Sequence, residues 1–346
     1  MPRTTLTRRP VPRSLIALLA ATALLLGAGL APAGVAAAAP SPNAPDEGGS
    51  KQLREALEAA AKGHIDAKNR LDNSKRRQVA LTNQLKQVEG RLVELSAQVG
   101  EVAAQSYRLG RLTPVSMLLG SSDPDAFLKR AAELDVLAQR DSKRLHDLNE
   151  AKAQATEAKV AIDTEVREQQ KQLAVLAKKK RDAEVALAKV SSGSGSGFNG
   201  SSSSAKPAPR NSDGSWPSES CSVNDPTPAS GCITPRTLHM LQQAKAAGYK
   251  RYVSCHRSGG GGEHPKGRAC DFAAATGGFE DKTATGGDKS YGDSLANWAK
   301  NNANRLGIMY VIWYRQIWMP NTGWRAYSGG GSPAADHTNH VHISMY

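Results

Sequence analysis

Residues 81–102 read LTNQLKQVEGRLVELSAQVGEV, and the apolar side chains in this stretch keep a regular spacing. The intervals alternate between four and three residues, at Leu81, Leu85, Val88, Leu92, Leu95, Val99 and Val102. Such heptad spacing keeps one apolar stripe turned toward a partner helix. A similar run occurs later in the chain, at Leu173, Leu176, Ala183, Leu187 and Val190. The two runs predict two helices of a coiled coil.

The helical pattern breaks between residues 107 and 124. Glycine and proline residues that do not fit a continuous helix cluster there, at Gly110, Pro114, Gly120 and Pro124. Asp123 followed by Pro124 is typical of an N-cap with proline at the first helical position. We therefore expect a long antiparallel hairpin over 51–190 with an apolar elbow at 115–119. A dimer of this chain would give the same pattern.

The N-terminus has the order of a secretory leader. Four arginines precede the apolar run LIALLAATALLLGAGL at residues 15–30, and a small-residue stretch, VAAAA, follows at 35–39. We expect a cleaved signal peptide at 1–39, a disordered segment at 40–50 and a secreted protein of the cell envelope. An uncleaved membrane anchor is the alternative.

The formal net charge is +13, which suits anionic lipids or wall polymers. Expected export argues against nucleic acid as the partner, and solvated lysines on a coiled coil would also explain the charge. Residues 191–220 are rich in Ser, Gly and Pro and predict a flexible tether. All five tryptophans lie beyond residue 215, which indicates a folded domain at 221–346.

The pattern of this domain predicts an α+β fold with a small, mainly antiparallel sheet. We expect helices at 234–248 and 293–306, and strands at 251–254, 268–273, 308–313, 316–319 and 340–344. The whole chain is thus expected to be multidomain, a long helical hairpin followed by this small domain.

The C-terminal domain holds all four cysteines of the chain, Cys221, Cys232, Cys255 and Cys270. An even number in an exported domain favours two disulfides. Three pairings are possible, of which we favour Cys221 with Cys232 and Cys255 with Cys270. Zinc–thiolate ligation is the competing interpretation, although no C-x-x-C pair is present.

Two short segments carry residues suited to metal chemistry. The segment HPKGRACD places His264 and Asp271 seven positions apart, and DHTNHVH at 336–342 ends in His340 and His342. In a strand, His340 and His342 project to the same face, so that one can bind a metal while the other handles protons. Two histidines and an aspartate are enough protein ligands for a hydrolytic zinc site, which keeps one position for water.

The pattern H-x-x-G-x-A-x-D followed by H-x-H resembles the LAS metallopeptidases, a group of D-Ala-D-Ala carboxypeptidases, phage endolysins and murein endopeptidases. The resemblance covers the core of the last 125 or so residues and implies one zinc ion held by His264, Asp271 and His342. It also implies His340 as the base and Arg257 as the group that stabilises the oxyanion. Asp336 and His337 are candidate second-layer residues that orient the ligands.

The sequence departs from that family at several positions. Gly262 stands where serine is usual, and Asn339 where many members have a glutamate base. Arg257 follows Cys255-His256 rather than tyrosine. The region also resembles a domain of secreted actinobacterial proteins whose activity is not well defined. Lysostaphin-like enzymes use a shorter His–Asp spacing, and Cys-His wall peptidases need an Asp-Cys-Ser context that this chain lacks.

The elbow, with YRLG at 107–110, LLGSS at 118–122 and DAFLKR at 125–130, resembles the coiled coils of secreted cell-division peptidoglycan hydrolases and their activators. That resemblance implies docking on a membrane complex of the ABC-transporter type, whereas the alternative is a rigid spacer. The expected function is a secreted zinc-dependent peptidoglycan peptidase that cleaves stem-peptide or cross-link amides. A non-catalytic wall-binding or hydrolase-activating scaffold is the alternative.

Overall fold

The computed structural model describes residues 48–110, 116, 118, 120, 123–191, 193–200, 203–259 and 261–346. The expected leader, residues 40–47 of the expected disordered segment and most of the apolar elbow lie outside these ranges. Within the described residues, no helix is both long enough and apolar enough to span a membrane.

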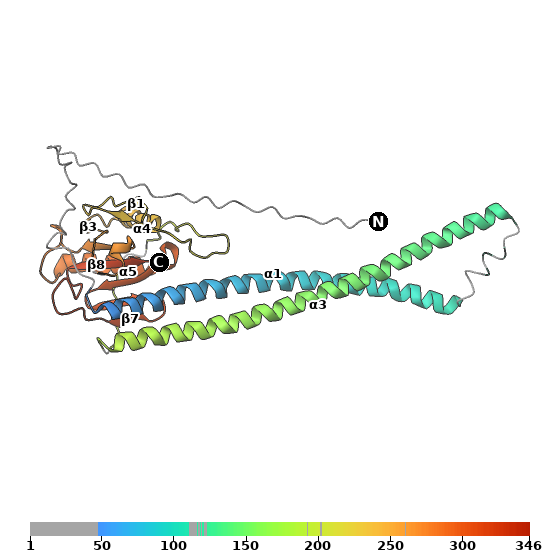
Figure 1. The fold of residues 1–346 in the computed structure, drawn as a ribbon, viewed down its shortest axis with the longest axis horizontal. Coiled ribbons are helices and arrows are strands. Elements are labelled where there is room, and N and C mark those ends of the chain that lie inside the picture. Colours follow the sequence, from blue (N-terminus) through green and yellow to red (C-terminus); the bar gives the residue numbers. More distant parts are fainter. Residues whose placement is uncertain are drawn as a thin grey trace, which may run out of the picture. The chain divides into compact units, whose positions relative to one another are not determined.

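Two long helices form the hairpin, α1 (Lys51–Leu109) and α3 (Pro124–Ala188), and they lie side by side over much of their length (Figure 1). The Ser50 hydroxyl caps α1 by accepting from the amide of Leu53, at 3.2 Å. The N-cap predicted at Asp123 is confirmed, because its side chain accepts from the amide of Asp125 and Pro124 opens the helix.

The hairpin is antiparallel, since the start of α1 packs with the end of α3. Leu57 shares a buried cluster with Leu187, and farther along Leu95 packs with Leu148 and Ala151. A bidentate ion pair also joins the helices, with Arg77 Nε and Nη2 at 2.7 and 3.0 Å from the Glu165 carboxylate.

One predicted seam position is wrong. Leu173 is 54% exposed, whereas the neighbouring Gln172 is buried. Gln172 donates to the side chain of Glu168 at 2.6 Å, so its amide group is partly satisfied inside the helix pair. The difference is local, because Ala183 and Leu187, two other predicted seam residues of α3, are buried as expected. Hydrogen bonding lowers the cost of burying the polar Gln172 side chain at the seam.

The C-terminal part forms a six-stranded antiparallel sheet with strand order β3-β4-β8-β5-β6-β7. Its strands are β3 (Val253–Ser254), β4 (Ala269–Ala273), β5 (Ile308–Trp313), β6 (Gln316–Met319), β7 (Gly323–Ala326) and β8 (His340–Met345). The helices are α4 (Pro235–Ala246) and α5 (Gly286–Leu306), and a separate ribbon pairs β1 (Val223–Asn224) with β2 (Cys232–Ile233). The α+β prediction is confirmed, although α5 begins earlier than expected and β1, β2 and β7 were missed.

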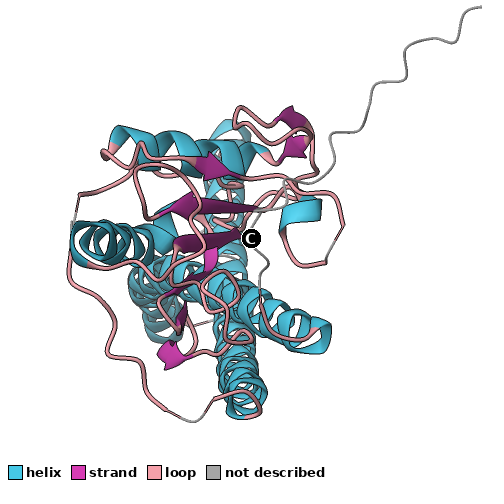
Figure 2. Cartoon of the chain, turned by 90° about the vertical axis from the view of Figure 1, so that its left-hand side faces the viewer, coloured by secondary structure: helices cyan, strands magenta, loops and turns pink. Residues whose placement is uncertain are grey.

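Helices cover the sheet on both sides (Figure 2). Along β5, Val311 and Trp313 belong to the core that contains α4 and α5. Tyr310 and Ile312 point the other way and pack with the first turns of α1 and the last turns of α3. The base of the hairpin thus packs against one of the two faces of the sheet.

The described residues of the expected tether, 191–220, pack on the domain and do not behave as a free linker. The amide of Gly197 donates to Gln316 Oε1 at 3.0 Å, and the amide of Ala205 donates to Asn302 Oδ1 at 2.8 Å. Phe198 packs edge-on against Trp324, and Trp216 is buried. The Ser/Gly/Pro-rich composition predicts a flexible tether, and this prediction is wrong for the described residues. Side-chain amides of the domain accept hydrogen bonds from backbone amides of this segment, which forms no helix or strand of its own.

Candidate metal centre

His264 lies in the 3₁₀ turn η1 (His264–Lys266), directly before β4. Gly267 ends this turn at φ +66°, and a Cβ there would lie 2.6 Å from Cys221 Sγ. The glycine of the H-x-x-G pattern is therefore required by both the turn and the close approach of the Cys221 sulfur. The Nδ1–H of His264 donates to the carbonyl of Cys255, which leaves Nε2 as the coordinating atom.

Asp271 on β4 is paired directly with His342 on β8, so their side chains share one face of the sheet. The Asp271 carboxylate lies 3.1 Å from His264 Nε2 and 2.8 Å from His342 Nδ1, and these two nitrogens are 3.3 Å apart. All three side chains are buried. The structure brings together the three ligands expected from the sequence, which come from η1, β4 and β8.

The three candidate ligand atoms would fit around a metal ion if they moved slightly apart. Ligand atoms about 2.0–2.1 Å from a tetrahedral zinc ion are separated by about 3.3 Å, and the three atoms here already lie within 4.8 Å of one another. Ser344 Oγ is 2.7 Å from His342 Nε2, so a partner fixes the second nitrogen of each histidine.

The electrostatics favour the protonation states that a metal needs. Burial would raise the pKa of Asp271, but His264 and His340 hold it well below its usual range. Burial lowers the pKa of His340 to about 4 and also lowers that of His337. At neutral pH the Asp271 carboxylate is therefore ionised, and His337 and His340 are neutral.

Arg257 and His340, the two residues expected to take part in catalysis, lie beside the ligands. Arg257 Nη1 is 3.8 Å from the Asp271 carboxylate, and His340 Nε2 is 3.6 Å from it. Asn339 orients His340: its Nδ2 donates to the Glu280 carbonyl, so its Oδ1 accepts from His340 Nδ1 at 2.7 Å. The lone pair of His340 is thus on Nε2, the nitrogen nearer to Asp271.

The two expected second-layer residues behave differently from each other. The His337 ring centroid lies 4.6 Å from that of His340 and 5.6 Å from that of His342, so His337 belongs to the cluster. Asp336 instead accepts from the amides of Gly329 and Gly331, at 2.9 and 3.2 Å, and pairs with Arg315. Its contacts fix a loop and do not reach the metal ligands.

Both expected disulfides are present, Cys221–Cys232 and Cys255–Cys270. The second joins the residue whose carbonyl orients His264 to the residue that precedes Asp271. Cys221, Cys232 and His256 also lie close enough together to suggest a metal site, but their two sulfurs are already bonded to each other. Zinc–thiolate ligation is thereby contradicted.

A charged network next to His264 could not be foreseen from the motifs. Glu58 of α1 accepts from Lys266 at 2.7 Å and Arg268 at 2.6 Å, and both cations also bond to the buried Glu263. Burial and the neighbouring Glu58 raise the pKa of Glu263 to about 7. The hairpin is thus bonded to the segment that carries the first candidate metal ligand, His264.

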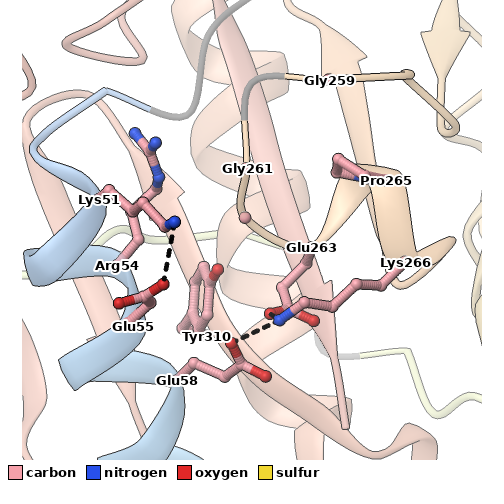
Figure 3. A pocket seen from close by; sticks show the side chains of 11 residues that line it. Lys51, Arg54, Glu55, Glu58, Gly259, Gly261, Glu263, Pro265, Lys266 and Tyr310 are labelled. Atoms are coloured by element: carbon pink, nitrogen blue, oxygen red, sulfur yellow. Dashed lines mark hydrogen bonds and ion pairs between the residues drawn. The ribbon is translucent and has the colours of Figure 1, made fainter.

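A pocket of about 280 Å³ opens between α1 and this segment (Figure 3). Lys51 and Glu55 lie on its α1 side, Lys266 on the opposite side, and Tyr310 stands between them. The Tyr310 ring stacks on His342, with centroids 5.6 Å apart and planes 16° apart. Tyr310 thus lines the pocket and also contacts the ring of a candidate metal ligand.

Comparison with known proteins gave one family match, to the family model described as VldE, C-terminal domain, over residues 229–338. The matched region is about a third of the chain; it contains Arg257, His264 and Asp271 and ends before His340 and His342. Neither the curated proteins nor the solved structures gave a match.

Proposed function

We propose that this chain is a secreted zinc-dependent peptidoglycan peptidase that hydrolyses an amide bond of a stem peptide or cross-link. One observation carries the proposal: the convergence of His264, Asp271 and His342 from separate elements into one buried ligand set. The presence of Arg257 and His340 beside this set supports hydrolysis beyond simple metal binding.

Zinc is the metal that we favour. Two imidazole nitrogens and one carboxylate form a donor set typical of hydrolytic zinc sites. These ligands would leave a divalent ion with a net charge of about +1, which preserves its power to acidify water. When bound, zinc would polarise an amide carbonyl and lower the pKa of a nearby water molecule.

The protein would supply proton transfer and charge stabilisation. His340 has its lone pair on Nε2 and is held by Asn339, so it is prepared to accept a proton from the attacking water and return it to the leaving amine. The Arg257 guanidinium would stabilise the negative charge that develops on the carbonyl oxygen. The cluster is buried, which strengthens both interactions.

The test is mass spectrometry of muropeptides incubated with the full chain. We expect a mass loss that stops when zinc is chelated and returns when zinc is restored. The His264→Ala variant should lose the activity, whereas His239→Ala should keep it, because His239 lies on α4, bonds to the Lys206 carbonyl and is not part of the candidate ligand set. Full activity of His264→Ala would refute the proposal.

Burial of the ligand set favours a second candidate, a wall-binding or activating scaffold whose metal is structural. His264, Asp271 and His342 are each at most 2% exposed. Structural zinc sites are closed, and they contribute directly to the free energy of folding. A zinc-loaded, folded chain that leaves every muropeptide intact would support this candidate over the peptidase.

We propose that the hairpin positions the domain at the cell envelope by binding a membrane complex. Apolar side chains are exposed near the start of α3, including Phe127, Leu128 and Val136, at 41, 64 and 66%. Exposed apolar clusters of this kind often mark protein contacts. The ABC-transporter type of partner rests on the sequence resemblance alone.

A further inference from the structure

A second pocket, of about 230 Å³, lies between α1 and α5, and none of the three metal ligands lines it. The contributing side chains are spaced so that each helix presents one face to the pocket. From α1 these are His64, Ile65, Lys68 and Asn69, and from α5 Lys300, Asn301, Ala303 and Asn304. The pocket is therefore built jointly by the hairpin and the C-terminal domain.

The polar lining consists of cations and amides. Lys68 and Lys300 both line the pocket, and no carboxylate does so among the described residues. Lys68 is paired with Asp72 at 2.9 Å, whereas Lys300 has no ion pair or hydrogen bond within the described ranges. The side chain of Asn301 is also without a described partner. This lining favours an anionic ligand that also carries polar groups able to bond to amides.

Aromatic side chains form another part of the wall. Trp318 of β6 lines the pocket together with Trp216. Trp216 is held in place, because the Arg210 guanidinium lies 3.6 Å from its ring and that of Arg236 lies 4.9 Å from it. Trp318 is only partly buried, and its indole ring offers a flat apolar surface that suits the C–H face of a sugar ring.

The size of the pocket limits what it can hold. The pocket volume is below the roughly 300–1,000 Å³ of drug-sized sites, which suits a single ring.

We propose that this pocket binds one acidic sugar unit, with its ring against Trp318 and its carboxylate at Lys300. The amides of Asn69 and Asn301 would bond to the hydroxyl or acetamido groups. An acidic amino sugar is a component of bacterial wall glycan, so the site would add a glycan contact to a protein proposed to act on wall peptide. The inference does not require catalysis or a bound metal.

The test is ligand-detected NMR on the full chain with N-acetylmuramic acid, N-acetylglucosamine and D-lactate. These probes are the acidic ring, a similar ring without the carboxylate, and the carboxylate without a ring. We expect the tightest binding for N-acetylmuramic acid and none for lactate. Lys300→Glu should weaken N-acetylmuramic acid binding about tenfold, because a charge-assisted bond is lost, and should leave N-acetylglucosamine binding unchanged.

The matched control is Lys245→Glu. Lys245 is exposed near the end of α4, a helix that packs in the same core cluster as α5. Lys245 does not line the pocket. This variant should bind both sugars like the unmodified chain. Absence of N-acetylmuramic acid binding, or an equal loss from Lys300→Glu and Lys245→Glu, would overturn the inference. The peptidase proposal would be unaffected by either result, because muropeptide cleavage is measured separately.

Discussion

At the scale of single residues, Ser344 shows how far side-chain alternation extends the candidate site. The same alternation that predicts a shared face for His340 and His342 also places Ser344 there, two residues later in β8. Its hydroxyl lies 2.7 Å from His342 Nε2 and is buried. Ser344 therefore orients His342, the second candidate histidine ligand, as the Cys255 carbonyl orients His264.

Ser344→Ala should lower zinc affinity by about tenfold, the lower end of the usual cost of losing such an outer partner. The measurement is competition with a chromophoric chelator on the full chain. Ser290→Ala is the control, because its hydroxyl bonds to the Gly286 carbonyl on α5. Equal affinities for the two variants would show that Ser344 does not position the ligand.

Other residues mark the limit of prediction from sequence. The structure brings together His264, Asp271 and His342, the candidate ligands that spacing and residue type predict. Asp336 was placed with the ligands because of its position in the motif, but its carboxylate bonds to the amides of Gly329 and Gly331. A short motif gives residue type and order along the chain, and it does not give the direction in which a loop residue points.

At the scale of elements, the Cys255–Cys270 disulfide joins two parts of the candidate metal centre. It connects the segment before Arg257 to β4, next to Asp271. The two disulfides close loops of similar length, with separations of 15 and 11 residues, so each should contribute about 3 kcal/mol to the free energy of unfolding. Their local effects on the ligands should differ.

The double variant Cys255→Ala/Cys270→Ala should lose zinc affinity by about tenfold or more, since the carbonyl that orients His264 loses its covalent anchor. Cys221→Ala/Cys232→Ala should lose a similar amount of thermal stability but less zinc affinity. Metal titration and thermal denaturation of both variants provide the comparison. An equal fall in zinc affinity would assign the effect to general destabilisation.

The elements were predicted well where pattern and packing agree. Strands β5 and β6 lie at the expected residues because their apolar runs are buried against helices. The heptad spacing predicts Leu173 in the seam of α3, where the structure has Gln172. The composition of residues 191–220 predicts a flexible tether, whereas the described residues of this segment pack on the domain. The Gln172 side chain bonds within α3, to Glu168. In 191–220, hydrogen bonds to another element decide the outcome, as with Gln316 and the amide of Gly197. Such long-range partners leave no periodic signal in the sequence.

At the scale of the whole molecule, the hairpin and the domain share a core. Leu57 of α1 is 3% exposed and packs in one cluster with Tyr310 and Ile317 of the sheet. A domain cut at residue 221 would expose that sheet face to water. In the sequence the hairpin and the domain look separate, because the hairpin has a heptad pattern and the domain has short strands and helices. Neither pattern shows which face of the hairpin packs on which face of the sheet.

Leu57→Ala should therefore destabilise the C-terminal part by about 2–5 kcal/mol, the range for removing a buried leucine. Leu95→Ala is the matched control, because Leu95 is 8% exposed on the same helix but packs only in the distal cluster with Leu148 and Ala151. All five tryptophans lie beyond residue 215, so their fluorescence reports unfolding of the domain. Leu57→Ala should lower the denaturant midpoint detected by fluorescence, and Leu95→Ala should chiefly lower helicity measured by circular dichroism. If both variants shifted the fluorescence transition equally, the hairpin would unfold as one unit with the domain along its whole length, and the base would have no special role.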